Sequence, residues 1–99
     1  MIQINGTIRI DPAALDAARA ALVTMMEHSR AEDGCLLYTF AQDLSDPGVL
    51  LLCERWRDAA ALEAHGKSAH MREFQQVMAA NPPIARDIMV YQTDEGRPL

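Results

Sequence analysis

The sequence lacks a long hydrophobic run. Nowhere in its 99 residues does an apolar stretch approach the roughly 20 residues that a membrane-spanning helix requires. Met1 runs directly into a segment of alternating residues, without the charged and then apolar leader of a secreted protein. We therefore expect a cytoplasmic protein with no membrane partner. The length predicts one domain with a thin core, so association between copies is an expected source of stability.

Cysteine and concentrated positive charge are also scarce. The two cysteines, Cys35 and Cys53, do not form a C-x-x-C pair, so we expect two reduced thiols and no metal site. The nine Lys and Arg residues are scattered, and the net charge is −5. Nucleic-acid binding needs a concentrated basic face, so we expect no nucleic-acid partner. A glycine-rich phosphate loop and a nucleophile elbow are absent as well.

The first third of the sequence shows alternation followed by helical periodicity. Residues 2–10 place four isoleucines on one side and polar residues on the other, which predicts a half-buried strand. Asp11 can then cap a helix whose first residue is Pro12, and apolar residues recur at helical spacing as far as Met26. We expect Gly34 to end this helix as a left-handed cap.

The middle of the chain predicts a hairpin. Residues 35–42 and 49–57 read as strands, and an Asp-Pro-Gly turn signal lies between them. The second of these strands carries apolar residues on both faces, which is typical of a strand that is covered on both sides. Helices of the same chain can cover one face, and a second copy could cover the other.

The hairpin also predicts where the two thiols lie. In the simplest register Cys35 is opposite Trp56 and Cys53 is opposite Tyr38. The thiols would then be offset from one another, which agrees with the absence of a disulfide.

The last part of the chain predicts a split helix and a final strand. Asp58 and Ser68 can each cap a helical piece, and Gly66 interrupts the helix between them. The predicted elements are helical pieces over 59–65 and 69–80, a strand over 84–93 and a loose tail over 94–99. The resulting β-α-β-β-α-β order is the ferredoxin-like α+β arrangement with an antiparallel sheet. Together with the two-sided strand and the thin core, it predicts a homodimer.

Three residues on the predicted strands could contribute to a ligand site. Asn5 lies on the polar face of the first strand, either as a solvated residue or as an amide that binds a ligand oxygen. Glu54 and Trp56 share a face of the third strand. Either Trp56 fills the core while Glu54 pairs with an arginine, or a carboxylate lies beside an aromatic wall. In the second case partial burial would raise the carboxylate pKa toward values useful for proton transfer.

Two histidines flank the predicted helix break. His65 and His70 are five residues apart, which is not the i, i+4 spacing of a helical zinc pair. With the helix broken at Gly66, both could point at one cavity, or both could be exposed residues at helix ends. The helix termini would favour protonated His65 and neutral His70. Tyr38 and Phe74 are expected mainly in the core and are also predicted to contact substrate.

Residues 54–74, ERWRDAAALEAHGKSAHMREF, carry a recognisable pattern. It consists of Glu-x-Trp, a capped helix with Leu-Glu-x-His, then Ser-x-His and an aromatic residue. This pattern resembles the signature of the antibiotic-biosynthesis-monooxygenase (ABM) domain family, and the opening strand with Asn5 and the Glu-Asp-Gly-Cys turn at 32–35 fit it as well. The resemblance covers residues 1 to about 93.

The resemblance implies a dimeric α+β barrel with a pocket between sheet and helices. The most similar branch is that of the bacterial quinol monooxygenases, which oxidise a dihydroxy-aromatic with O2 and use neither metal nor flavin. We therefore expect a cofactor-free monooxygenase whose partners are a small hydroxy-aromatic or quinol substrate, O2 and a second copy of the chain. The catalytic residues predicted in this way are His65, His70 and Asn5, and the substrate-binding residues are Trp56, Glu54, Tyr38 and Phe74.

Other members of the family leave alternatives open. One is an isomerase acting on a phosphorylated sugar-like signal, and it retains both histidines. A non-catalytic dimer that binds a ligand is a further alternative. The haem-degrading branch fits less well, because His65 occupies the position of its aromatic residue and Gln75 lies near that of its haem ligand.

Overall fold

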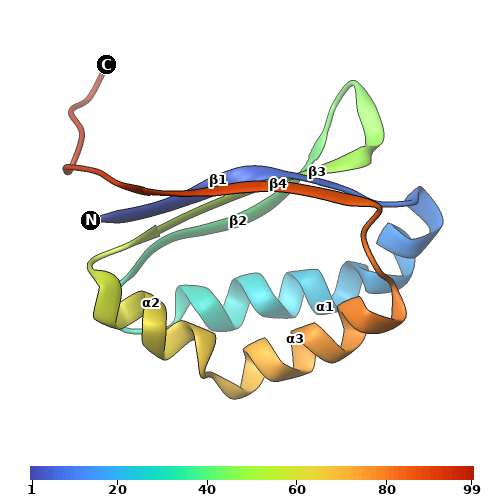
Figure 1. Cartoon of the computed structure of the whole chain (residues 1–99), viewed down its shortest axis with the longest axis horizontal. Helices are drawn as coiled ribbons and strands as arrows, with labels where there is room; N and C mark the ends of the chain where they lie inside the picture. Colours follow the sequence, from blue (N-terminus) through green and yellow to red (C-terminus); the bar gives the residue numbers. More distant parts are fainter.

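Figure 1 shows a computed structural model of the chain, which describes all 99 residues. One layer of strands lies above one layer of helices, so the sheet has a covered face and an open face. The predicted β-α-β-β-α-β order is confirmed, and its second helical segment consists of two helices. The elements are β1 (Ile2–Arg9), α1 (Pro12–Arg30), β2 (Cys35–Asp43), β3 (Asp46–Trp56), α2 (Ala59–Gly66), α3 (Ala69–Ala80) and β4 (Ala85–Gln92).

The four strands form one antiparallel sheet in the order β2-β3-β1-β4. This is the predicted ferredoxin-like arrangement, with β1 in the interior between β3 and β4. Ile4 pairs with Glu54 on one side and with Val90 on the other, while Ile8 pairs with Arg86. β4 passes so close to Gly6 that a Cβ atom there would lie 2.0 Å from the carbonyl oxygen of Asp87.

Helix α1 begins as predicted and ends earlier than predicted. The Asp11 side chain accepts a hydrogen bond from the backbone N–H of Ala13 at 2.8 Å. The helix ends at Arg30, and the following Ala31 has ordinary right-handed backbone angles. Gly34 is therefore not the helix cap. It has a φ of +85° in the turn before β2, where an added Cβ would also meet the Ala61 side chain at 2.6 Å.

The hairpin register differs from the prediction by one residue over most of its length. Cys35 lies opposite Trp56 as expected, but Cys53 lies opposite Thr39 rather than Tyr38. A register shift between Cys35 and Leu37 causes the difference, since an extra residue in β2 displaces every later pair. Both thiols are free, as predicted.

The junction between α2 and α3 is built by side-chain caps. Asp58 caps α2 through the N–H of Ala61 at 2.9 Å. Ser68 Oγ accepts from the N–H of Met71 at 3.2 Å and donates to the carbonyl of His65 at 2.7 Å. α2 extends one residue beyond the prediction, through Gly66. The caps place the last turn of one helix beside the first turn of the next.

The helices bury one face of the sheet in two adjoining clusters. One surrounds Trp56 and includes Met25 of α1, while the other surrounds Ile10 and includes Leu22 of α1. The open face instead carries partly exposed apolar side chains from β2, β3 and β4. None of the helices is both long enough and apolar enough to cross a membrane.

Candidate active site

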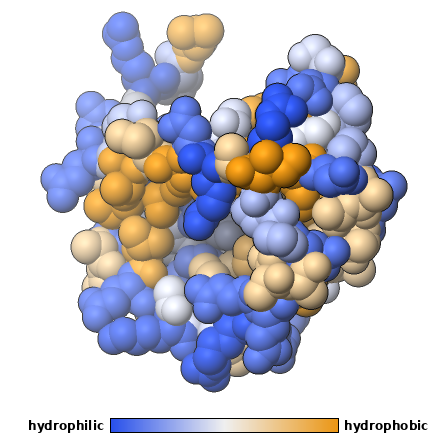
Figure 2. Space-filling view, turned by 45° about the vertical axis from the view of Figure 1, so that its right-hand side comes forward, coloured by the Kyte–Doolittle hydropathy of each residue, from blue (hydrophilic) through white to orange (hydrophobic).

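A cavity of about 360 Å³ lies between α3 and the covered face of the sheet. This size falls within the usual range for small-molecule sites. Figure 2 shows the surface hollowed between the upper and lower layers on this side of the molecule, with apolar surface above the hollow. The lining from α3 comprises Met71, Phe74, Gln75, Met78 and Ala79, and that from the strands comprises Ile8, Tyr38, Phe40, Leu52, Glu54, Arg86 and Ile88.

Glu54 is the carboxylate in the cavity wall. β3 points it toward the helices, on the same face as Trp56 two residues later, and only 6% of its surface is exposed. Its Oε1 accepts a hydrogen bond from the indole Nε1 of Trp56 at 2.9 Å. Burial raises the pKa of Glu54, the hydrogen bond from Trp56 opposes this, and the negative charge of Glu32 raises the pKa further. Glu54 is therefore a stronger base than an exposed glutamate.

Trp56 holds the Glu54 carboxylate in place through this hydrogen bond and is itself fully buried. Its side chain has 0% exposure and packs against His65, with ring centroids 4.6 Å apart, and against Tyr38 at 6.4 Å. Tyr38 is also buried, and burial raises the pKa of its hydroxyl above the usual value. Tyr38 therefore contributes an apolar wall and does not act as a ready source of protons.

Next to Trp56, two histidines contact the carboxylate of Glu32. His65 Nδ1 lies 2.9 Å from Glu32 Oε2, and His70 Nε2 lies 2.5 Å from Glu32 Oε1. Burial lowers the pKa of His65, and the Glu32 carboxylate opposes this effect. The expectation that the α2 terminus favours protonated His65 is therefore wrong, because desolvation of a side chain that is 3% exposed outweighs the helix terminus.

The same three side chains are the group that could hold a metal ion. Ligand atoms of Glu32, His65 and His70 lie within 4.8 Å of one another, and two histidines with a carboxylate are a known donor set for transition metals. The contact of His65 Nδ1 with Glu32 Oε2 is a hydrogen bond, whereas that of His70 Nε2 with Glu32 Oε1 is a close approach without hydrogen-bond geometry. The exposed ring of His28 lies against His70 at 5.5 Å and extends this cluster toward the surface.

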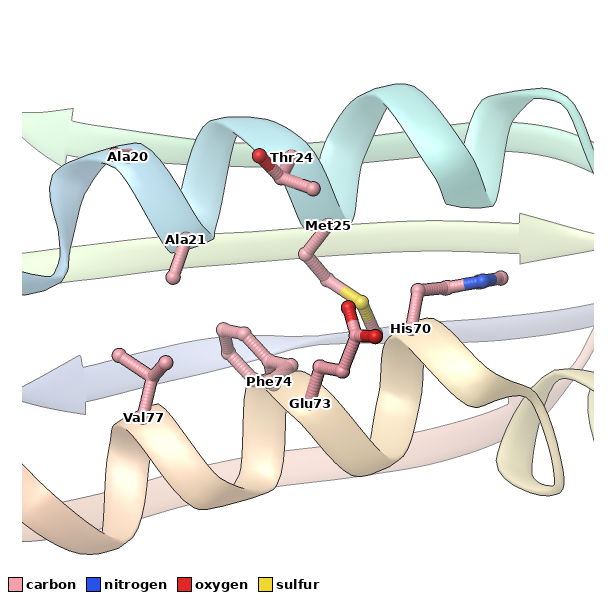
Figure 3. Close-up of a pocket in the computed structure, with 8 residues that line it drawn as sticks. All are labelled: Ala20, Ala21, Thr24, Met25, His70, Glu73, Phe74 and Val77. Carbon is pink, nitrogen blue, oxygen red and sulfur yellow. The ribbon is translucent and has the colours of Figure 1, made fainter.

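A second groove, of about 220 Å³, lies between α1 and α3. Figure 3 shows His70 at one end of it, with its ring directed away from Phe74 and Val77. Met25 forms part of the groove from the α1 side. This groove reaches neither Glu54 nor Trp56, so we take the cavity beside Glu54 as the candidate active site.

The structure brings most of the predicted site residues together, but not all of them into the cavity. Glu54, Tyr38 and Phe74 line it. Trp56 and the two histidines lie outside the cavity lining, and the ring of His65 packs against Trp56 and His70. Asn5 lies on the opposite face of the sheet, because it pairs with Cys53 and Met89 in register with the open face.

Several site residues were not singled out from the sequence. Glu32 was part of a turn motif without a role of its own, and Gln75 and Arg86 had no predicted contact with a ligand. The α3 positions could have been found from their spacing, since Met71, Phe74, Gln75 and Met78 follow the i, i+3, i+4, i+7 pattern of one helix face. Whether Arg86 reaches the cavity depends on how β4 pairs with β1, and the sequence alone does not specify that pairing.

Comparison with known proteins identifies the family. Residues 1–77 match the family described as antibiotic biosynthesis monooxygenase. The chain belongs to the antibiotic biosynthesis monooxygenase (ABM) family. The resemblance seen in residues 54–74 is thereby confirmed, and the ABM fold accounts for the four-stranded antiparallel sheet with its helices on one face.

Three similar proteins show how far the similarity extends. The uncharacterized protein sll1783 of Synechocystis is 30% identical over 98 residues, which cover 99% of this chain and 67% of that protein. YcnE of Bacillus subtilis, by its name a candidate monooxygenase, is 27% identical over 74 residues, covering 75% of this chain and 78% of YcnE. A solved structure from Deinococcus radiodurans, titled as a candidate antibiotic biosynthesis monooxygenase, has a TM-score of 0.88 at 27% identity and covers 100% of this chain and 98% of its own. The family description and the names of the Bacillus and Deinococcus proteins suggest monooxygenase activity and name no substrate.

Proposed function

We propose that the protein is a monooxygenase that oxidises a small hydroxy-aromatic or quinol with O2 in the cavity beside Glu54, without a metal or organic cofactor. The observation that carries this proposal is a buried carboxylate held by Trp56 in the wall of an otherwise largely apolar cavity. An electron-rich aromatic anion can itself donate electrons to O2. The protein then has to deprotonate the substrate, orient it and exclude water.

The proposed reaction begins with proton transfer to Glu54. Oε1 is engaged by the Trp56 indole, which leaves Oε2 to take the proton of a substrate hydroxyl. The resulting anion is oxidised by O2, and one oxygen atom bonds to a ring carbon that loses its hydrogen. The second oxygen atom leaves as water with the hydroxyl proton and the ring hydrogen, so a phenol and O2 give a quinone and H2O. Phe74 and Met71 enclose the ring and limit access of water.

The catalytic roles of His65 and His70 stay predictions. Neither residue lines the cavity, and the ring of His65 packs against Trp56 and against Tyr38, which does line it. The hydrogen bond of His65 to Glu32, and the closeness of His70 to the same carboxylate, support a role of this cluster in receiving or supplying protons. Asn5 would need a different location for its ligand, because it lies on the open face of the sheet.

An oxygen electrode tests the proposed activity. We expect the purified protein to consume O2 with some members of a panel of hydroquinones, catechols and naphthols, and to form a product with one added oxygen atom, which is a quinone from a naphthol and a hydroxyquinone from a hydroquinone or catechol, detected by absorbance and by mass. A protein-free reaction and the Glu54→Gln variant control for spontaneous oxidation. Tight binding without O2 uptake across the panel would instead support a ligand-binding dimer. Conversion of a phosphorylated sugar-like diketone without O2 uptake would support an isomerase.

We also propose that a second copy covers the open face of the sheet. Leu51, Met89 and Tyr91 lie there and are 41–54% exposed, which is unusual for large apolar side chains on a shared face. Light scattering is expected to give twice the chain mass of 11.0 kDa at micromolar concentration. Met89→Asp should shift the mass toward that of one chain, whereas Leu44→Asp, in the exposed β2–β3 turn, should not. A wild-type mass of one chain would contradict the dimer.

A further inference from the structure

The cavity has a charged residue at each of two separated positions. Glu54 lies in one wall, and Arg86 reaches the cavity from β4. Glu54 pairs with Ile4 of β1, whereas Arg86 pairs with Ile8 of the same strand. Four residues of strand correspond to about 13 Å along the sheet, and two strand spacings to about 10 Å across it. Both side chains lie on the covered face of the sheet and line the same cavity, so the two charges occupy separate positions in its wall.

The lining between these two charges is mainly apolar. Leu52 and Ile88 pair with Gly6, which lies between Ile4 and Ile8 along β1, and Phe74 lines the cavity from α3. Helix α3 lines the cavity along much of its length, from Met71 to Ala79. The cavity therefore favours a flat apolar body with a different polar group at each end.

Arg86 has no acidic partner within the chain. The ion pairs of the structure engage Arg9, Arg19, Arg57 and Lys67 with nearby acidic residues, and Arg86 is not among the paired residues. Its sequence neighbour Asp87 points to the opposite face, since successive side chains of a strand alternate. The guanidinium is thus available to a ligand, and its planar donor pattern matches a carboxylate.

We propose that the cavity selects substrates that carry an anionic group, such as a carboxylate, at the end opposite the reacting hydroxyl, and that Arg86 binds this group. This inference rests on the proposed function only for the location of the substrate. The Glu54 end then receives the hydroxyl, and the arginine fixes the orientation of the ring. The predicted substrate class is a hydroxylated aromatic acid.

Binding without turnover tests this proposal. The probes are 3,4-dihydroxybenzoate, its uncharged amide and catechol, each titrated while the fluorescence of Trp56 is recorded. Trp56 is the only tryptophan in the sequence and is hydrogen bonded to Glu54, so it reports on the cavity wall. We expect wild-type protein to bind the acid about two- to fivefold more tightly than the amide, as for an exposed ion pair. The preference should decrease with added salt.

Two methionine variants provide the decisive comparison. Arg86→Met keeps most of the side-chain length and should abolish the preference for the acid over the amide. Arg72→Met removes an exposed arginine of α3 that does not line the cavity, and it should retain the preference. Equal affinity of wild type for acid and amide, an unchanged preference in Arg86→Met, or no binding of any probe would each overturn the proposal. A preserved preference without O2 uptake would overturn the proposed oxidation alone, and O2 uptake without the preference would overturn this inference alone.

Discussion

Replacement of Trp56 by alanine is expected to lower the free energy of unfolding by about 3–5 kcal/mol. The side chain has 0% exposure, lies in the core cluster with Met25 and Tyr38, and donates a hydrogen bond to Glu54. A loss of this size is a large part of the roughly 5–15 kcal/mol that stabilises a typical domain. Urea unfolding followed by far-UV circular dichroism measures it, because the variant has no tryptophan to report by fluorescence.

Two further variants identify the origin of the Trp56 effect. Trp56→Phe retains an aromatic ring and loses the indole N–H, so it should destabilise less than alanine while leaving Glu54 without its hydrogen-bond donor. Leu44→Ala, in the exposed β2–β3 turn, should leave the unfolding midpoint unchanged. If Trp56→Ala unfolds at the wild-type urea concentration, Trp56 does not organise the core in solution.

Replacement of Glu54 by glutamine is expected to lower turnover by about 10²–10⁴-fold on any substrate that the oxygen electrode identifies. The amide oxygen of glutamine can still accept the Trp56 hydrogen bond, so the fold should persist. Circular dichroism and the melting temperature verify this. Wild-type turnover in the variant would exclude Glu54 as the base.

The pH dependence provides a second test of Glu54. Catalysis needs the ionised carboxylate, and burial raises the pKa of this group, so turnover should fall on acidification at a higher pH than for an exposed glutamate. Acidification should affect the stability of the fold in the opposite way, because protonation of Glu54 favours the folded state. An acid with a raised pKa in the folded protein favours folding at acidic pH, and this contribution is lost as the pH rises through that pKa. The free energy of unfolding of Glu54→Gln, taken relative to that of wild type, should therefore be higher at neutral pH than at pH 4.

The same turnover assay decides the roles of the two histidines. If His65 and His70 handle protons, each alanine variant should lose about 10²–10⁴-fold in turnover while remaining folded. If they only support the packing around Trp56, His65→Ala should mainly lower the melting temperature, because the ring of His65 packs on the indole. Glu32→Gln keeps the shape of their shared partner and should follow the behaviour of the histidine variants.

The fold could be predicted from the sequence because its signals are local. Asp11, Asp58 and Ser68 cap the helices at the positions where their side chains can reach free N–H groups. The alternation of β3 also placed Glu54 and Trp56 on one face, since side chains two residues apart in a strand point the same way. The irregularity near Leu37 escaped prediction, because the alternation of β2 does not reveal an extra residue between Cys35 and Leu37.

The remaining parts of the site depend on contacts between distant segments. Glu32 meets His65 and His70 because the turn after α1 lies beside the α2–α3 junction, and nothing in the spacing of these residues encodes that proximity. Arg86 reaches the cavity only through the register of β4 with β1. For Asn5 the polar face of the strand was predicted correctly, but the cavity lies on the other face.

The interior position of β1 makes completion of the sheet a late event during synthesis. Ile2 pairs with Gln92 and Arg9 pairs with Ala85, so β1 leaves the ribosome long before its partner strand β4. At about 5–20 residues per second this delay lasts several seconds, whereas the local β2–β3 hairpin forms in microseconds. Throughout that interval the alternating Ile2–Arg9 segment has an unpaired edge on which other nascent chains can associate.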